Sequence, residues 1–149
     1  MKHSSGIIPY RVGSDGELEF FVGHPGGQTR PFWSFLKGCV EKGEDTLEAA
    51  VREFGEESGY SLSVNELRTI IPLGTVRQNE EKIVTAYAVE CEDIDPDRCH
   101  SNLVDGSTIP EIDRYAWMTL DELERLTHPA HIQFYHKLVN HLAYGGEYD

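Results

Sequence analysis

Residues Gly38–Tyr60, GCVEKGEDTLEAAVREFGEESGY, carry the strongest pattern in this sequence of 149 residues. Apolar residues recur there at spacings i, i+3, i+4 and i+7, which is typical of a helix with one buried face: Leu47, Ala50, Val51 and Phe54. Asp45 suits the N-cap, and Glu48 three residues later completes a capping box. Gly59 suits the C-terminal end. We therefore predict a helix that begins after Asp45 and ends before Gly59.

Three carboxylates lie on the other side of this predicted helix, at Glu53, Glu56 and Glu57. Like charges at spacings i+3 and i+4 destabilise a helix, and Arg52 relieves only part of that repulsion. Mg²⁺ prefers oxygen ligands and often shares them with substrate phosphates. Such a cluster is what a Mg²⁺ or Mn²⁺ site for phosphate chemistry requires, and a solvated acidic helix face is the alternative. A mid-helix glycine, Gly55, predicts that another group approaches the helix closely.

The same stretch resembles the signature of the Nudix hydrolases, G-x5-E-x7-R-E-U-x-E-E-x-G-U, in which U is a bulky apolar residue. Its fixed positions are all filled, by Gly38, Glu44, Arg52, Glu53, Phe54, Glu56, Glu57, Gly59 and Tyr60. The resemblance implies an α/β fold, an α/β/α sandwich in which a mixed sheet lies beside the signature loop–helix–loop. It covers nearly the whole chain, so we expect one domain over residues 1–149.

The resemblance also implies the cofactor and the catalytic residues. The expected ligands of Mg²⁺ or Mn²⁺ are the carboxylates of Glu53, Glu56 and Glu57 and the peptide carbonyl of Gly38. Arg52 would orient the glutamates through a bidentate, charge-assisted pair and so belongs to the catalytic set. We expect Glu44 to be a structural group and not a metal ligand.

The segment before the signature, Trp33–Gly38 (WSFLKG), is similar to one in diadenosine tetraphosphate hydrolases and diphosphoinositol polyphosphate phosphohydrolases. It departs from them at Leu36, where those relatives usually have proline. His24–Gly27 and Pro110–Trp117 look like a bacterial group of predicted nucleotide pyrophosphohydrolases. We expect the substrate to be bound by four residues: Lys37 and Arg30 at its phosphates, and Trp33 and Tyr87 stacked on a base. Core packing is the alternative role for each aromatic residue.

The general base is harder to assign. Glu80 and Glu81 lie at a predicted turn between two strands and are candidates, although an exposed hairpin tip would look the same. Four histidines near the C-terminal end are expected to be partly exposed polar residues and not metal ligands: His128, His131, His136 and His141.

The composition restricts the partners. Thirteen basic against 26 acidic residues give a net charge of −13, which argues against broad binding of nucleic acid or anionic membranes. Three cysteines without a C-x-x-C pair predict reduced thiols in a cytoplasmic protein. No apolar run reaches membrane-spanning length. We expect a small nucleotide as partner, and we leave a homodimer open.

The remaining elements are predicted from local patterns. Strands are expected at Ser4–Val12, with Pro9 marking an edge or a bulge, and at Leu18–Val22, Leu67–Gln78, Lys82–Glu90 and Arg114–Met118. Helices are expected at Leu120–Leu126 and from Pro129 to about Leu142. The segment Asp93–Pro110 is expected to be irregular. Met1–Lys2 and Gly145–Asp149 are expected to fray.

Three functional hypotheses follow. The first is a metal-dependent pyrophosphohydrolase of a dinucleoside polyphosphate, such as diadenosine tetraphosphate. The second keeps the chemistry but acts on nucleoside triphosphates, nucleotide sugars or capped RNA, of which capped RNA fits the net charge poorly. The third is a nucleotide-binding module of the same fold without turnover.

Overall fold

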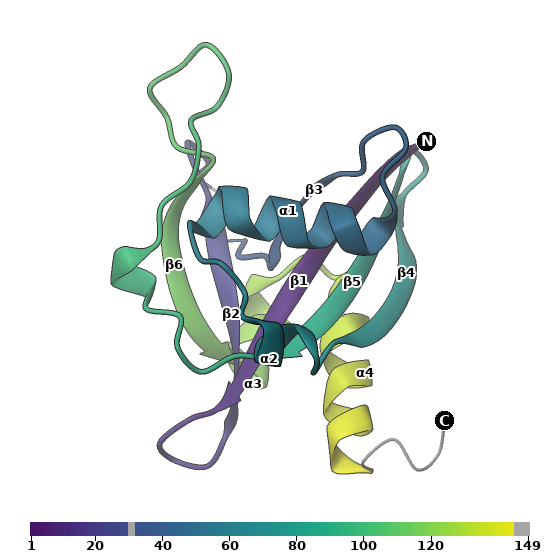
Figure 1. Ribbon diagram of the computed structural model, residues 1–149, viewed down its shortest axis with the longest axis vertical. Coiled ribbons are helices and arrows are strands. Elements are labelled where there is room, and N and C mark those ends of the chain that lie inside the picture. Colours follow the sequence, from purple (N-terminus) through teal and green to yellow (C-terminus); the bar gives the residue numbers. More distant parts are fainter. Residues whose placement is uncertain (30–31, 145–149) are drawn as a thin grey trace.

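The computed structural model describes residues 1–29 and 32–144 as a six-stranded mixed sheet with helices on both faces (Figure 1). The strands are β1 (Lys2–Val12), β2 (Leu18–Pro25), β3 (Leu36–Cys39), β4 (Ile71–Asn79), β5 (Lys82–Glu90) and β6 (Ile112–Thr119). The helices are α1 (Thr46–Ser58), α2 (Val64–Leu67), α3 (Leu120–Leu126) and α4 (Ile132–Ala143), with a 3₁₀ turn η1 (Pro96–Arg98). No helix of the described ranges has the length and apolarity to cross a membrane.

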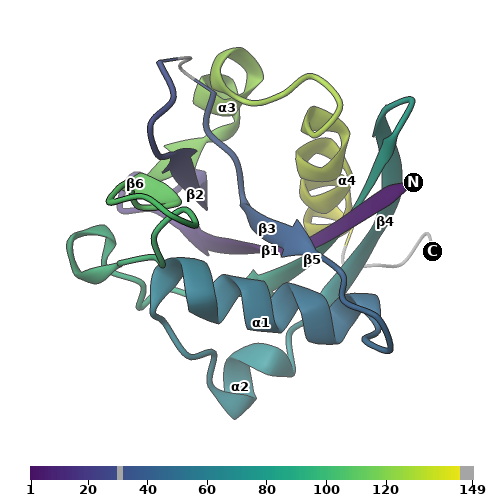
Figure 2. The ribbon, with the colours of Figure 1, turned by 90° about the horizontal axis from the view of Figure 1, so that it is seen from above.

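The sheet runs in the order β4-β5-β1-β2-β6, and β3 pairs with β1. Figure 2 shows α1 and α2 on one side of this sheet and α3 and α4 on the other. Successive residues of a strand point to opposite faces, so Ile7 packs in the cluster under α1 and Ile8 in the cluster under α4. Each face therefore has its own buried core. His131, the N-cap residue of α4, is 2% exposed, which corrects the expectation of an exposed histidine. The predicted α/β class and mixed sheet are confirmed.

The expectation that Pro9 marks an edge or a bulge is wrong, because β1 is a central strand. It pairs in parallel with β5 along Lys2–Tyr10. On its other side, β1 pairs with β3 up to Ile7 and with β2 from Tyr10 onward. Pro9 falls between these two partners, where a missing N–H leaves no ladder bond unmade. The sequence pattern could not reveal that one strand changes partner at this residue.

Several predicted elements agree with the structure. The hairpin of β1 and β2 is present, and the bounds of β5 and α3 match the prediction. The strand predicted from Leu67 is wrong at its start, because Ser63 and Glu66 form a capping box that begins the short helix α2. Lys2 does not fray, since it pairs with Lys82. Gly145–Asp149 lie outside the described residues.

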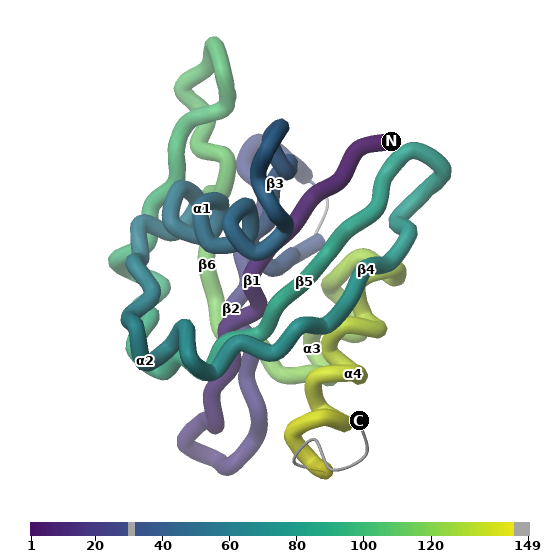
Figure 3. Tube along the Cα trace, turned by 45° about the vertical axis from the view of Figure 1, so that its right-hand side comes forward, coloured from purple at the N-terminus to yellow at the C-terminus, as the bar shows by residue number. Residues whose placement is uncertain are grey.

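One further element, β3, differs from the prediction. The four residues of β3 carry no alternating pattern of apolar and polar side chains, so the sequence does not predict this strand. Their backbone groups pair with β1. The segment between η1 and β6 projects beyond the C-terminal end of α1 (Figures 1 and 3). Within that segment, the backbone of Val104 donates to Ile109 and that of Glu111 donates to Asn102. Apart from η1, residues 93–110 contain no helix and no strand, so the predicted irregular segment is confirmed, and these hydrogen bonds close its projecting arm.

Candidate active site

Helix α1 is fixed at both ends by its own caps and by the sheet. Its N-cap is the predicted capping box of Asp45 and Glu48, and Gly59 ends it at φ 73°. Near its start, the Ser5 hydroxyl donates to the carbonyl of Thr46 at 2.7 Å. Near its end, the Tyr115 hydroxyl donates to a carbonyl of the last turn. The helix therefore cannot slide along the sheet without breaking these part-buried hydrogen bonds, and its side chains have a fixed register.

The buried face of α1 is close to the predicted one. Ala50 and Phe54 are fully buried, and the Phe54 ring meets the ring of Phe21 at a centroid distance of 6.4 Å. Ala49 is buried as well, which the apolar spacing did not predict. Among the described residues, no atom outside the backbone of the helix lies within 4 Å of a Cβ built at Gly55, so no protein group makes the predicted close approach.

The three glutamates of the acidic face differ strongly in exposure. The side chains of Glu56 and Glu53 are 44% and 14% exposed, and Glu57 is 7% exposed. Burial, followed by the charge of Glu53, raises the pKa of Glu57 to about 8. Burial also raises the pKa of Glu53. Oε2 of Glu57 is buried without a hydrogen-bond partner, an unusual state for a carboxylate oxygen. It is an open position for a cation or a proton.

Arg52 joins the signature loop to these glutamates. Its Nε and Nη2 donate to Oε2 and Oε1 of Glu44 at 2.7 and 3.0 Å, a bidentate pair. Its Nη1 donates to Glu53 at 3.0 Å and to Glu56 at 3.2 Å, and its Nη2 also donates to the carbonyl of Cys39 at 3.0 Å. The guanidinium lowers the pKa of Glu44 to about 2. Arg52 therefore holds the loop and the helix as one unit.

The oxygen atoms here suit a hard divalent cation. Gly38 lies so close to the carboxylate of Glu53 that a Cβ at position 38 would overlap it. The backbone of β3 thus lies directly beside the acidic face of α1. The partnerless Oε2 of Glu57 belongs to the same face. No three His, Cys, Asp or Glu side chains of the described ranges already converge as a metal site. Carboxylates and a peptide carbonyl are nevertheless the ligand types that Mg²⁺ takes.

A cleft of about 330 Å³ opens beside the acidic face. Lys37, Glu57 and Glu111 line its charged part, and Val104 of the projecting arm lines its rim. Burial, followed by the charge of Lys82, lowers the pKa of Lys37 to about 8, against the opposing effect of Glu57. The predicted phosphate ligand Lys37 thus lines the same cleft as Glu57, one of the predicted metal ligands.

Glu111 was missed by the sequence analysis. Its charge raises the pKa of both Glu53 and Glu57, and its backbone is fixed by hydrogen bonds to Gly26 and Asn102. The one sequence signal for it is its place in the segment Pro110–Trp117, which resembles a group of nucleotide pyrophosphohydrolases.

Other predicted site residues lie elsewhere. Glu80 and Glu81 are at the exposed turn between β4 and β5, beside Met1, and do not line the cleft. Tyr87 packs against the core under α1, and its hydroxyl bonds to Thr46 Oγ1. Arg30 lies outside the described residues.

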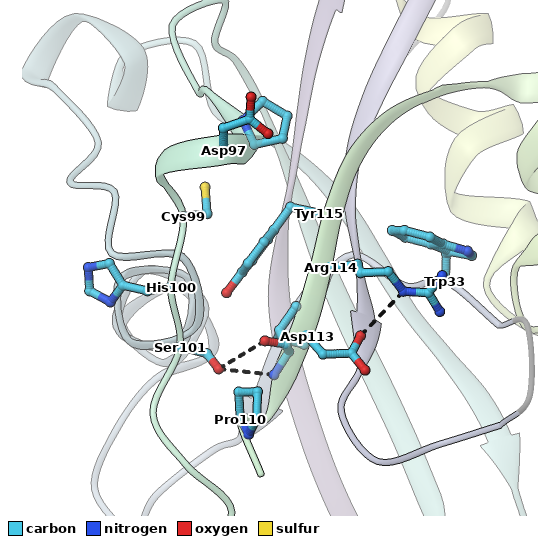
Figure 4. A pocket seen from close by; sticks show the side chains of 11 residues that line it. Trp33, Asp97, Cys99, His100, Ser101, Pro110, Asp113, Arg114 and Tyr115 are labelled. Carbon is cyan, nitrogen blue, oxygen red and sulfur yellow. Dashed lines mark hydrogen bonds and ion pairs between the residues drawn. The ribbon is translucent and has the colours of Figure 1, made fainter. Parts of the chain in front are cut away.

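Trp33 lines a second, larger cavity of about 640 Å³, which shares Ile112 with the first (Figure 4). The guanidinium of Arg114 lies 5.3 Å from the centroid of the Trp33 ring. The ring of the buried His24 lies 5.5 Å from that of Trp33, and its Nδ1 is 2.9 Å from Oδ1 of Asp113. Tyr115 and Ser101 complete the wall. The cavity combines an aromatic face with a cation and carboxylates, so it suits a nucleoside better than a phosphate chain.

The NUDIX domain model matches residues 6–138. The protein named "Putative mRNA-decapping protein" of Acanthamoeba polyphaga mimivirus is 34% identical over 124 residues, 78% of this chain and 32% of that protein. An RNA pyrophosphohydrolase of Roseobacter denitrificans is 40% identical over 65 residues, 40% of this chain and 41% of that protein. The chain thus spans about a third and two fifths of the lengths of these relatives.

Solved structures agree on the fold. The crystal structure of a C. elegans Ap4A hydrolase binary complex has a TM-score of 0.70 and 19% identity, covering 96% of this chain and 98% of that one. The Nudix domain of Shewanella oneidensis NrtR, complexed with ADP ribose, has a TM-score of 0.68 and 12% identity, covering 94% and 87%. At these identities, the likeness concerns the fold alone.

Proposed function

Because the chain belongs to the Nudix family, we propose that it is a metal-dependent pyrophosphohydrolase acting at the cleft beside α1. The observation that carries the proposal is the buried carboxylate of Glu57, which has a partnerless oxygen and lines the same cleft as Lys37. A cation would satisfy the first group and a phosphate the second. The side chains that would meet a metal-bound phosphate chain are thus already adjacent.

The roles of the residues follow from their positions. Glu53, Glu56, Glu57 and the carbonyl of Gly38 would hold Mg²⁺ or Mn²⁺, which clamps phosphate oxygens and lowers the pKa of a bound water molecule. Arg52 orients the carboxylates and does not touch the substrate. Since phosphoryl transfer depends mainly on positioning and electrostatics, this fixed arrangement is the chief contribution of the chain.

Glu111 is our candidate for the general base, in place of Glu80 and Glu81. It lines the cleft, whereas the other two lie outside it. A base must come within hydrogen-bond reach of the attacking water, directly or through one further water. Glu111→Gln should therefore lower kcat much more than it changes KM in steady-state kinetics. An unchanged kcat would remove Glu111 from this role.

We propose a dinucleoside polyphosphate as the substrate. The support is a pair of cavities that share Ile112, one lined by Lys37 and Glu57 and the other by Trp33. A molecule with a charged chain and a stacking base matches both. The net charge of −13 disfavours a long anionic partner.

RNA 5′ ends are the second candidate. The two curated relatives carry names that refer to mRNA decapping and to RNA pyrophosphohydrolysis. Their substrates share the phosphoanhydride bond with dinucleoside polyphosphates, so the same catalytic residues would serve. The two candidates differ in the group attached to the nucleotide that the cleft would bind: a second nucleoside in one, and an RNA chain in the other.

A substrate panel separates these candidates. Diadenosine tetraphosphate, ATP, ADP ribose, 5′-triphosphorylated RNA and capped RNA are incubated with Mg²⁺ and with Mn²⁺, and the products are separated by ion-exchange chromatography. We expect the highest kcat/KM for diadenosine tetraphosphate. Preference for an RNA would support the second candidate. Binding without turnover of any of them would identify a non-catalytic module.

The base-stacking role of Trp33 has a separate test, because the chain has only two tryptophans. Trp117 is the internal control, since its Nε1 bonds to the carbonyl of Ile94 at 3.0 Å and its ring carries Arg11. Without metal, a bound nucleotide should quench the fluorescence of wild type and Trp117→Phe. It should leave Trp33→Phe unquenched. Equal quenching in all three proteins would place the base elsewhere.

A further inference from the structure

Two residues that line the larger cavity also hold the last turn of α1. The hydroxyl of Tyr115 donates to the backbone carbonyl of Glu57. The backbone N–H of His100 donates to the carbonyl of Ser58 at 3.1 Å. The last carbonyls of a helix have no partner within it, so each needs one from elsewhere. Here two of these partners come from the wall of the cavity in which Trp33 lies (Figure 4).

The side chains beside these two hydrogen bonds are closely packed. The ring of Tyr115 stacks on that of the fully buried Phe21, at a centroid distance of 5.9 Å. The ring of His100 lies against Gly59, since a Cβ built at Gly59 would be 2.5 Å from its Nε2. Densely packed groups transmit a displacement instead of absorbing it. A molecule that orders this wall should therefore also order the turn that carries Glu57.

The same turn reaches the smaller cleft from its other side. The side chain of Glu57 lines that cleft and has the partnerless Oε2, while its backbone carbonyl is held by Tyr115. Ile112 is buried and lines both cavities. The position of the Glu57 carboxylate thus depends on a hydrogen bond that belongs to the larger cavity.

We propose that a nucleoside in the larger cavity and the divalent cation at the acidic face strengthen each other's binding, with Tyr115 as the positioning residue between them. The nucleoside orders the wall, so the cation then binds to a turn that has already lost its freedom. By linkage, the cation raises the affinity for the nucleoside by the same factor. The inference rests on the proposed function for the nature of both ligands. Its consequence is that the acidic face holds its cation most tightly when a nucleotide is present.

The first test measures this linkage without turnover. Mn²⁺ is titrated into metal-depleted protein with and without saturating adenosine, and the free Mn²⁺ is measured by electron paramagnetic resonance. Adenosine has no phosphate, so it cannot reach the cation through a phosphate chain. In wild type, adenosine should lower the Kd for Mn²⁺ roughly fivefold, at the lower end of the usual coupling between two sites. In Tyr115→Phe, which loses only the hydroxyl, this effect should disappear.

Tyr87→Phe is the matched control. The Tyr87 hydroxyl also holds α1, through Thr46 Oγ1 in the first turn, and Tyr87 lines neither of the two cavities. This variant should keep the effect of adenosine on Mn²⁺. The inference is overturned if adenosine does not bind to wild type or leaves its Kd for Mn²⁺ unchanged. It is equally overturned if Tyr115→Phe keeps the effect or if both variants lose it.

A turnover assay separates this inference from the proposed function. With diadenosine tetraphosphate, Tyr115→Phe should need a roughly fivefold higher Mg²⁺ concentration for half-maximal activity, because the bound nucleotide no longer supports the cation. Tyr87→Phe should match wild type. If wild type turns over the substrate but shows no linkage, the proposed function stands and the inference fails. If adenosine and Mn²⁺ are linked through Tyr115 but no substrate turns over, the inference stands and the proposed function fails.

Discussion

Glu44 and Glu57 belong to one signature, yet the structure places them in opposite electrostatic states. Glu44, in the loop before α1, accepts two hydrogen bonds from Arg52, and its pKa falls to about 2. Glu57, in the last turn of α1, has a buried partnerless oxygen and a pKa raised to about 8. The first carboxylate is already satisfied within the protein, whereas the second lacks a partner. We conclude that the signature contains two regions: a structural region, with Glu44 and Arg52, and a ligand-binding region, with Glu56 and Glu57.

The largest expected effect comes from the ligand-binding region. Glu57→Gln and Glu56→Gln should each lower metal-dependent turnover by roughly 100-fold or more, since even outer-shell partners of a metal contribute up to that factor. Stability should be kept or improved, because like-charge repulsion is relieved. Turnover assays and urea unfolding measure the two quantities.

Glu41→Gln is the matched control for these variants. Glu41 lies in the signature loop with its side chain 68% exposed, so turnover should remain near that of wild type. Wild-type activity in both Glu56→Gln and Glu57→Gln would contradict the assignment of this region. Equal losses in all three variants would indicate a general effect of charge instead.

Arg52→Lys tests whether the structural region contributes to turnover only by positioning the glutamates. A lysine keeps the charge but cannot span both oxygens of Glu44, so the glutamates would be held less firmly. We expect kcat to fall roughly 10- to 100-fold, as for other partners that orient metal ligands. The Mn²⁺ concentration for half-maximal activity should rise with it. A lower kcat at unchanged metal dependence would mean that Arg52 contacts the substrate.

The two regions should also respond oppositely to pH in the metal-free protein. The pKa of Glu57 is raised from 4.5 to about 8, so its contribution to stability is complete below pH 4.5 and is lost as the pH rises through 8. The pKa of Glu44 is lowered to about 2, so its contribution is present above pH 4.5 and is lost as the pH falls toward 2. Urea unfolding between pH 3 and 9 should therefore show two limbs, in roughly these windows.

Single substitutions assign those limbs. Glu57→Gln should remove the fall in stability toward pH 8 and leave the acid limb intact. Glu44→Gln should do the reverse. If Glu57→Gln keeps the alkaline fall, the buried carboxylate is not the group responsible for it.

The sequence revealed the local features of the site and missed those that depend on distant partners. The caps of α1 at Asp45 and Gly59, and the nearness of Lys37 to the acidic helix, follow from residues close in the chain. The burial of Glu57 and the entry of Glu111 into the cleft depend on how the β6 edge meets α1. The same holds for Pro9, whose position depends on the strands beside β1. No spacing within one segment carries that information.

The smallest expected effect is that of a substitution at Gly55, which lies in α1 outside both regions. The sequence suggested that something packs against this glycine, whereas the structure leaves the space beside it open. Gly55→Ala should then stabilise the protein by about 1 kcal/mol, the difference in helix propensity between the two residues. The substitution should leave turnover unchanged, because no side chain of either region is displaced. Urea unfolding and turnover with Mg²⁺ decide the question together. Greater stability with impaired turnover would mean that the substrate itself lies against Gly55, which would extend the ligand-binding region to this part of the helix.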